Sequence, residues 1–235
     1  MKKLLIASSS TIYGTDFLEY LLPNLTSFFK GVTTLLFIPY ARPSGISYDE
    51  YTLKVTRFFN SIHIDVTGIH EFDDPKEALL NAEAIFTGGG NTFELVNQLH
   101  KQNLFSVLYQ VLTSGTPYLG TSAGSNICGI SMMNTNDMPI VYPPSFQTLG
   151  IIPFNINAHY LDPIKDSKHM GETRETRIKE FHFFNTTSVL GLREGSWLEV
   201  DDRSIILKGK SAGKWFEKDK TPIDIPIDTV LNNYF

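Results

Sequence analysis

One short segment carries a residue pattern typical of nucleophilic catalysis. Residues 120–124 read Gly-Thr-Ser-Ala-Gly, a G-x-S-x-G motif with Ser122 at its centre. The motif requires a strand–turn–helix context, and a strand at 116–120 and a helix at 123–128 are predicted on either side of it. The glycines allow the sharp turn that lifts the serine oxygen to the edge of a sheet. The pattern predicts a hydrolase with Ser122 as nucleophile, although the same pentapeptide also occurs in ordinary strand–helix turns.

A second glycine-rich loop, Gly88-Gly89-Gly90-Asn91-Thr92, also follows a strand and opens a helix. Its backbone N–H groups suit either an oxyanion or a phosphate. The loop lacks the glycine spacing of a dinucleotide site and the Lys-Ser/Thr ending of a P-loop. We expect an oxyanion hole formed by the N–H groups of Gly90 and Ala123. Asn91 is a candidate both for capping the following helix and for binding substrate.

A catalytic serine needs a base, and His159 is the strongest candidate. It ends a short apolar run in the segment 155–160, Asn-Ile-Asn-Ala-His-Tyr. That placement predicts a strand end, where the active sites of open α/β sheets lie. His169 lies in a polar loop. The remaining histidines sit in ordinary strand or helix patterns: His63, His70, His100 and His182.

An acid must orient that histidine, and the sequence offers Asp137, Asp162 and Glu194. Chain order does not choose among them, because triads recur in several unrelated orders. Glu194 follows a predicted core strand at 187–192 and therefore shares the expected sheet edge with His159. We predict Glu194 as the orienting residue and keep Asp137 as the alternative.

These residues require an α/β scaffold with a mostly parallel sheet and helices on both faces. Short apolar runs, typical of buried strands, alternate with amphipathic helical segments. Predicted strands are 3–9, 33–39, 62–69, 84–87, 116–120 and 187–192, and predicted helices are 16–29, 49–59, 75–82, 92–100, 123–128 and 172–184. After residue 196 the pattern becomes antiparallel, with strands at 197–200, 205–208 and 214–217. We predict one α/β hydrolytic domain over residues 1–235, with a small antiparallel C-terminal appendage.

The overall composition excludes several function classes. A net charge of −5 argues against a general nucleic-acid partner, which needs a basic face. Cys128 is the sole cysteine, so an internal disulfide is impossible and a cytoplasmic location is expected. No apolar run is long enough for a signal peptide or a membrane span. The histidines and the cysteine lack zinc-ligand spacing, and no metal or cofactor is expected.

With these residues assembled, the sequence resembles the peptidase E family of α-aspartyl dipeptidases over nearly its whole length. The matching blocks are 8–11, 37–39, 49–52, 66–70, 88–93, 122–124, 135–141, 157–159, 171–175 and 194–197. The resemblance implies a fold similar to class I glutamine amidotransferase domains and hydrolysis of dipeptides, and some short peptides, with N-terminal aspartate. It places the family's serine at Ser122 and its histidine at His159. The third member falls on either Asp137 or Glu194.

The same resemblance suggests which residues recognise the substrate. A substrate carboxylate suits a guanidinium, which binds it through two hydrogen bonds. Arg174 is our first choice, with Arg177 nearby, and Glu172 is the candidate partner of the substrate ammonium. A solvated charged helix face is the alternative interpretation of these residues. Three positions beside the expected catalytic residues depart from the family pattern: Thr121, Ala158 and Arg193.

Two rival functions fit parts of the pattern. A cyanophycinase-like serine hydrolase acting on another aspartyl substrate would share the glycine loop and the elbow. A non-catalytic small-molecule binding module on the same scaffold would not need Ser122, His159 and an acid together, and their presence argues against it. Nothing in the sequence specifies an oligomeric state.

Overall fold

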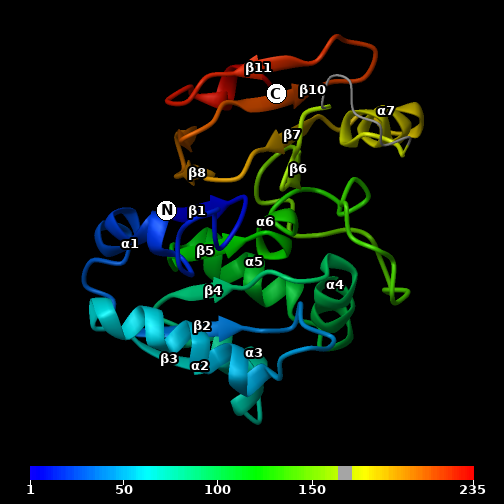
Figure 1. Cartoon of the computed structure of the whole chain (residues 1–235). Coiled ribbons are helices and arrows are strands. Elements are labelled where there is room, and N and C mark those ends of the chain that lie inside the picture. Colours follow the sequence, from blue (N-terminus) through cyan, green and yellow to red (C-terminus); the bar gives the residue numbers. More distant parts are fainter. Residues whose placement is uncertain (164–170) are drawn as a thin grey trace.

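The strands form two sheets that meet near the middle of the molecule (Figure 1). The computed structural model describes residues 1–163 and 171–235. The strands are β1 (Leu4–Ala7), β2 (Thr34–Ile38), β3 (Asp65–Gly68), β4 (Ile85–Thr87), β5 (Tyr118–Thr121), β6 (Asn155–Ala158), β7 (Val189–Leu192), β8 (Ser196–Val200), β9 (Ile205–Gly209), β10 (Gly213–Phe216) and β11 (Ile223–Ile225). The helices are α1 (Leu22–Phe28), α2 (Tyr48–Phe59), α3 (Pro75–Leu80), α4 (Thr92–Lys101), α5 (Phe105–Ser114), α6 (Ala123–Asn126) and α7 (Arg174–Phe184), with 3-10 turns at Glu19–Leu21, Asn60–Ile62, Ile69–Glu71 and Leu231–Asn233.

The first sheet has seven strands in the order β3-β2-β4-β5-β1-β8-β9. The strands from β3 to β1 pair in parallel, whereas β8 and β9 add to the β1 edge as antiparallel strands. Parallel pairing brings the carboxyl ends of β1, β4 and β5 to one edge. The predicted α/β fold with a mostly parallel sheet is therefore confirmed.

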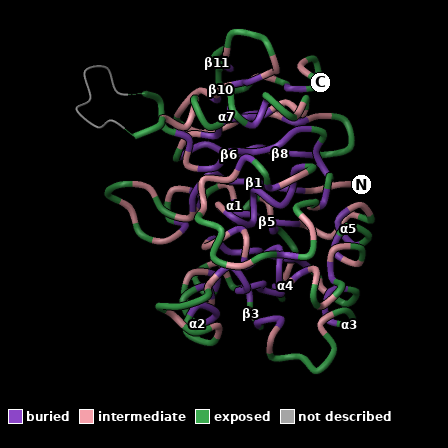
Figure 2. The backbone as a smooth tube through the Cα atoms, turned by 90° about the vertical axis from the view of Figure 1, so that its right-hand side faces the viewer, coloured by how far each residue is buried: buried purple, intermediate pink, exposed green. Residues whose placement is uncertain are grey.

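Alternation along the strands divides the apolar residues between two faces, and this explains why both faces carry helices. In β1, Leu4 and Ile6 enter one core cluster while Leu5 and Ala7 enter the other. Helices α1 and α2 cover the face of Leu5, and α3 to α6 cover the face of Leu4. Figure 2 shows the buried strands running through the centre with exposed segments outside. Each fully buried large apolar side chain contributes roughly 1.5–3 kcal/mol relative to exposure.

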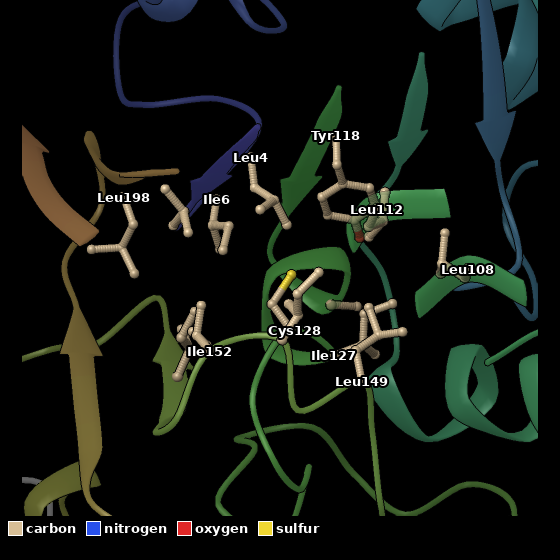
Figure 3. Close-up of a cluster of buried hydrophobic side chains, with 14 of the residues drawn as sticks. Leu4, Ile6, Leu108, Leu112, Tyr118, Ile127, Cys128, Leu149, Ile152 and Leu198 are labelled. Atoms are coloured by element: carbon tan, nitrogen blue, oxygen red, sulfur yellow. The ribbon is translucent and has the colours of Figure 1, made fainter. Parts of the chain in front are cut away.

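The core on the α6 side also holds the sole cysteine. Cys128 is fully buried among Leu4, Ile6, Tyr118 and Ile127 (Figure 3). Its Sγ lies 3.5 Å from the carbonyl oxygen of Gly124. Burial raises the pKa of this thiol well above its usual range.

Side-chain caps define where four helices begin, and at α3 the cap is Asp74, which accepts the N–H groups of Lys76 and Glu77. Ser47 and Glu50 form a capping box at α2, and Asn91 accepts the N–H of Glu94 at α4. Thr173 accepts the N–H of Thr176 at 3.1 Å and starts α7. Such caps satisfy N–H groups that the helix cannot pair itself and contribute about 1 kcal/mol each.

The second sheet has four strands in the order β11-β10-β7-β6, with β6 and β7 parallel. Helix α7 packs on it through Ile178 and Phe181. The antiparallel C-terminal strands were predicted as one appendage, but the structure divides them between the two sheets. β8 and β9 extend the first sheet, whereas β10 pairs with β7 in the second. The sequence interpretation also missed α5 and β11.

Candidate active site

Ser122 lies on a strained turn between β5 and α6. Its backbone has φ 54° and ψ −110°, a conformation that residues with a Cβ rarely adopt. The turn is held because the N–H of Ser122 donates to the carbonyl of Ala7, at 3.2 Å. A Cβ at Gly124 would lie 2.2 Å from the carbonyl oxygen of Thr87, so only glycine allows the elbow to pack on β4.

His159 follows β6 and faces the serine. Its Nε2 lies 2.9 Å from Ser122 Oγ, and its Nδ1 lies 2.7 Å from Glu194 Oε1. An ionised carboxylate only accepts hydrogen bonds, so Nδ1 carries the proton and Nε2 is the acceptor for the serine hydroxyl. The His159 backbone is left-handed, with φ 53°. The three side chains thus form a continuous hydrogen-bonded row.

Glu194 lies in the short connection between β7 and β8, where the chain passes from one sheet to the other. The next residue, Gly195, has φ 78°, which lets the chain turn immediately after the acid. The side chains of His159 and Glu194 remain 38% and 47% exposed, so substrate can approach them from solvent.

Asp137, the alternative acid, has a different partner. Its Oδ2 accepts the backbone N–H of Thr92 at 2.7 Å, at the first turn of α4. Asp162 is also engaged elsewhere, with Arg193. The structure therefore brings Glu194, and neither aspartate, into contact with His159.

The glycine loop packs directly against the elbow. A Cβ at Gly89 would lie 2.9 Å from Ser122 Cβ. The N–H of Gly89 donates to Tyr51 Oη at 3.0 Å, which leaves it unavailable to substrate. Within residues 1–163 and 171–235, the N–H of Gly90 has no acceptor. Ala123 begins α6, so its N–H has no partner within that helix.

Arg174 occupies the first position of α7 and is half-buried. Burial lowers the pKa of its guanidinium, and Arg177 lowers it further, whereas the charges of Asp137 and Glu194 raise it. Both carboxylates are thus close enough to influence Arg174. Among the described residues it has no ion-pair partner.

The other predicted binding residues occupy outer positions. Glu172 and Arg177 form an exposed ion pair, with Nε and Oε2 3.8 Å apart. Asn91 caps α4 and donates from Nδ2 to the carbonyl of Met138 at 2.9 Å. It therefore anchors the loop that carries Asp137. His169 lies outside the described residues.

The departures from the family pattern have distinct surroundings. Thr121 is fully buried and so does not line an open pocket, and its Oγ1 has no partner in the described structure. Ala158 is also buried. The guanidinium of Arg193 is held by Asp162 and Asp224, at 2.7 and 2.8 Å.

Several polar residues that the sequence analysis did not single out support the site. Asn126 Nδ2 donates to Thr92 Oγ1 at 3.0 Å, and Asn126 Oδ1 accepts the N–H of Ala158 at 3.3 Å. Asn136 donates to the carbonyl of Ala158, and Asn157 donates to that of Asn134. In the sequence, the high frequency of asparagine between residues 126 and 157 was the feature that could have indicated this polar network. Buried amides this numerous need partners, because an unpaired one is costly.

The described residues contain neither a metal-binding cluster nor a membrane-spanning helix. No group of three or more His, Cys, Asp or Glu side chains is placed to hold a metal ion. None of the helices in the described segments has both the length and the apolar character needed to cross a membrane.

A serine on a strand–helix elbow, hydrogen-bonded to a histidine and then to a carboxylate, defines the class of serine hydrolases. Comparison with known sequences narrows the class. The chain belongs to peptidase family S51, whose profile matches residues 4–208. The predicted family and peptidase activity are thereby confirmed.

Individual relatives agree with that membership. Peptidase E of Streptomyces coelicolor is 44% identical over 229 residues, covering 97% of this chain and 93% of the relative. A probable alpha-aspartyl dipeptidase of Drosophila melanogaster is 43% identical over 221 residues, covering 93% and 91%. The crystal structure of a peptidase from an acI-B1 Actinobacterium shares the fold, with a TM-score of 0.73 at 16% identity over 98% of this chain and 96% of that one.

Proposed function

We propose that the chain is a serine dipeptidase that hydrolyses the bond after an N-terminal aspartate. The observation that carries the proposal is the hydrogen-bonded row of Ser122, His159 and Glu194. The relative named as a probable alpha-aspartyl dipeptidase supports the choice of substrate. The buried, unpaired Cys128 suits a reducing compartment, and we place the enzyme in the cytoplasm on that basis.

The reaction starts when His159 Nε2 takes the proton of Ser122 Oγ as the oxygen attacks the scissile carbonyl. Glu194 holds Nδ1–H and stabilises the imidazolium that forms. The N–H groups of Gly90 and Ala123 receive the oxyanion. His159 then protonates the leaving amine, and an acyl-enzyme remains on Ser122. A water molecule, deprotonated by the same histidine, releases aspartate.

Substrate selection rests on Arg174. Its half-buried guanidinium is influenced by the charge of Glu194 and has no ion-pair partner in the described structure, so a substrate carboxylate can accept two hydrogen bonds from it. A buried carboxylate without a cation would cost several kcal/mol. Glu172 is the proposed partner of the substrate ammonium. Its contact with Arg177 is long and exposed, so exchanging partners costs little.

A dipeptide panel tests the proposal. Release of leucine from Asp-Leu is compared with release from Asn-Leu, Glu-Leu and Ala-Leu, and a β-aspartyl-arginine dipeptide is included for the cyanophycinase-like alternative. We expect Asp-Leu to be cleaved with the highest kcat/KM and Ser122→Ala to lower kcat by about 10⁶. Equal cleavage of Asn-Leu, or preference for the β-linked dipeptide, would exclude the proposed specificity. Activity retained in Ser122→Ala would exclude the mechanism.

A further inference from the structure

One buried hydroxyl joins both segments that carry the base and the acid. Ser8 follows β1 and is fully buried. Its Oγ donates to the carbonyl of Leu192 at 2.7 Å and accepts the backbone N–H of His159 at 2.9 Å. Leu192 is the last residue of β7, two positions before Glu194. A single side chain therefore fixes the backbone of the histidine and the strand end that leads to the glutamate.

The nucleophile is tied to the same strand end. The carbonyl of Ala7, next to Ser8, accepts the N–H of Ser122 at 3.2 Å and the hydroxyl of Ser125 at 2.6 Å. Ala7 also pairs with Thr121 in the sheet register. Residues 7 and 8 thus contact the serine turn through a carbonyl and the histidine turn through a hydroxyl.

This arrangement matters because the row crosses from one sheet to the other. Ser122 follows β5 in the seven-stranded sheet, whereas His159 follows β6 in the four-stranded sheet (Figure 1). β6 and β1 are not paired strands, so no sheet ladder sets the distance between them. His159 is also left-handed, at φ 53°, and a non-glycine residue stays there only when its surroundings hold it.

We propose that Ser8 is a positioning residue for the hydrolysis, which sets the separation of His159 Nε2 and Ser122 Oγ across the junction of the two sheets. The inference rests on the proposed function, because it assumes the row of Ser122, His159 and Glu194. Ser8 is buried behind the row and touches no substrate. Its loss should slow the chemical step and leave substrate binding nearly unchanged.

The experiment compares Ser8→Ala and Ser8→Cys with a matched control, Ser196→Ala. Ser196 is equally buried, and its Oγ also donates to one carbonyl and accepts one N–H, both of Ser211. The control therefore loses the same number and kind of hydrogen bonds, but none of them involves His159. Equilibrium urea unfolding is used to show that each variant is folded under assay conditions.

We expect Ser8→Ala to lower kcat for Asp-Leu by about 10², since a displacement of about 1 Å can cost that much, with KM within about threefold of wild type. Ser8→Cys, whose thiol is a weak donor and acceptor, should fall between alanine and wild type. Ser196→Ala should keep kcat within about threefold. Combining Ser8→Ala with Glu194→Gln should cost less than the product of the single effects, because both act through His159.

A second readout separates this inference from the proposed function. The rate at which a fluorophosphonate modifies Ser122 reports activation of the nucleophile without any peptide. If wild type failed to cleave Asp-Leu but reacted with the probe, the proposed substrate would be wrong. The probe rates of the Ser8 variants would still test the positioning role of Ser8. A wild-type probe rate in folded Ser8→Ala, or in Ser8→Cys if the alanine variant does not fold, overturns the inference. So does an equal loss of kcat in Ser196→Ala.

Discussion

The carboxylate of Asp137 accepts the backbone N–H of Thr92 at 2.7 Å, and this contact commits it to the start of α4. Negative charge is favourable at a helix N-terminus, where unpaired N–H groups concentrate. Asp137 therefore has a structural partner that competes with any contact to His159. In the part of the chain that the structure describes, the Glu194 carboxylate has no other hydrogen-bond partner, and its Oε1 lies 2.7 Å from Nδ1 of His159.

Glu194→Gln should lower kcat by about 10⁴, since an amide in place of an orienting acid stabilises the wrong histidine tautomer. Asp137→Asn should lower it by about tenfold or less, because the asparagine oxygen can still accept the Thr92 N–H. Steady-state kinetics on Asp-Leu measure both. A larger loss in Asp137→Asn would transfer the orienting role to that residue.

Arg174→Met should lower kcat/KM for Asp-Leu by at least about 10², because hydrogen bonds to charged groups contribute about 1.5–3 kcal/mol each. It should also narrow the gap between Asp-Leu and Asn-Leu, since the neutral amide does not benefit from the guanidinium. Lys179→Met, at an exposed position of the same helix, is the control. Equal losses on both dipeptides would make Arg174 a structural residue.

Ser122→Gly and Ser122→Ala should both be inactive, yet they should differ in stability. Alanine keeps the Cβ that makes φ 54° and ψ −110° unfavourable, whereas glycine adopts this region readily. We expect the glycine variant to be about 1–2 kcal/mol more stable than the alanine variant. Urea unfolding measures the difference. Equal stabilities would mean that the elbow stores no strain.

Asp162→Asn should reveal an acid-dependent contribution to stability. Hydrogen bonds from Arg193 hold the pKa of Asp162 below its usual value, so the folded state favours the charged form. The stabilisation is therefore fully present above about pH 4, the usual range of an aspartate, and is lost as pH falls through the lower folded pKa.

At pH 7 we expect the free energy of unfolding of wild type to be about 1–2 kcal/mol higher than that of Asp162→Asn, allowing for the partial exposure of the carboxylate. That difference should shrink below pH 4. The exposed Asp73→Asn is the control and should show no such change. A difference between wild type and Asp162→Asn that stayed constant down to pH 2 would contradict the linkage.

The sequence predicted the serine elbow well because its pattern is local. Gly120 is required by its close approach to Gly124 within the turn, and although Gly124 is required by a contact with Thr87 on β4, the motif records both glycines directly. His159 and Glu194 were placed by their positions after apolar runs, which the parallel strands β6 and β7 bring to one edge. The structure places both side chains in contact, while their catalytic roles remain predictions.

Other features escaped prediction for physical reasons. Helix α5 is rich in aromatic and β-branched residues, which favour strands, and these obscured the helical spacing of its buried Leu108, Val111 and Leu112. The contact of Ser8 with His159 joins positions 151 residues apart, and no local pattern records it. The ion pair of Arg193 with Asp162 and Asp224 depends in the same way on β10 and β11 folding beside β7.

Because Cys128 is buried, the labelling of its thiol reports whether the core of the protein is closed. A thiol that is fully buried and holds its proton is inert to alkylating reagents while the core stays closed. Modification requires an opening that exposes the interior, and its rate then follows the free energy of that opening. Because the chain has one cysteine, the product carries a single label whose appearance by mass spectrometry counts opened molecules. Each variant described above except Ser8→Cys, which adds a second thiol, can thus be checked for a closed core in its own assay buffer without adding a probe to the sequence.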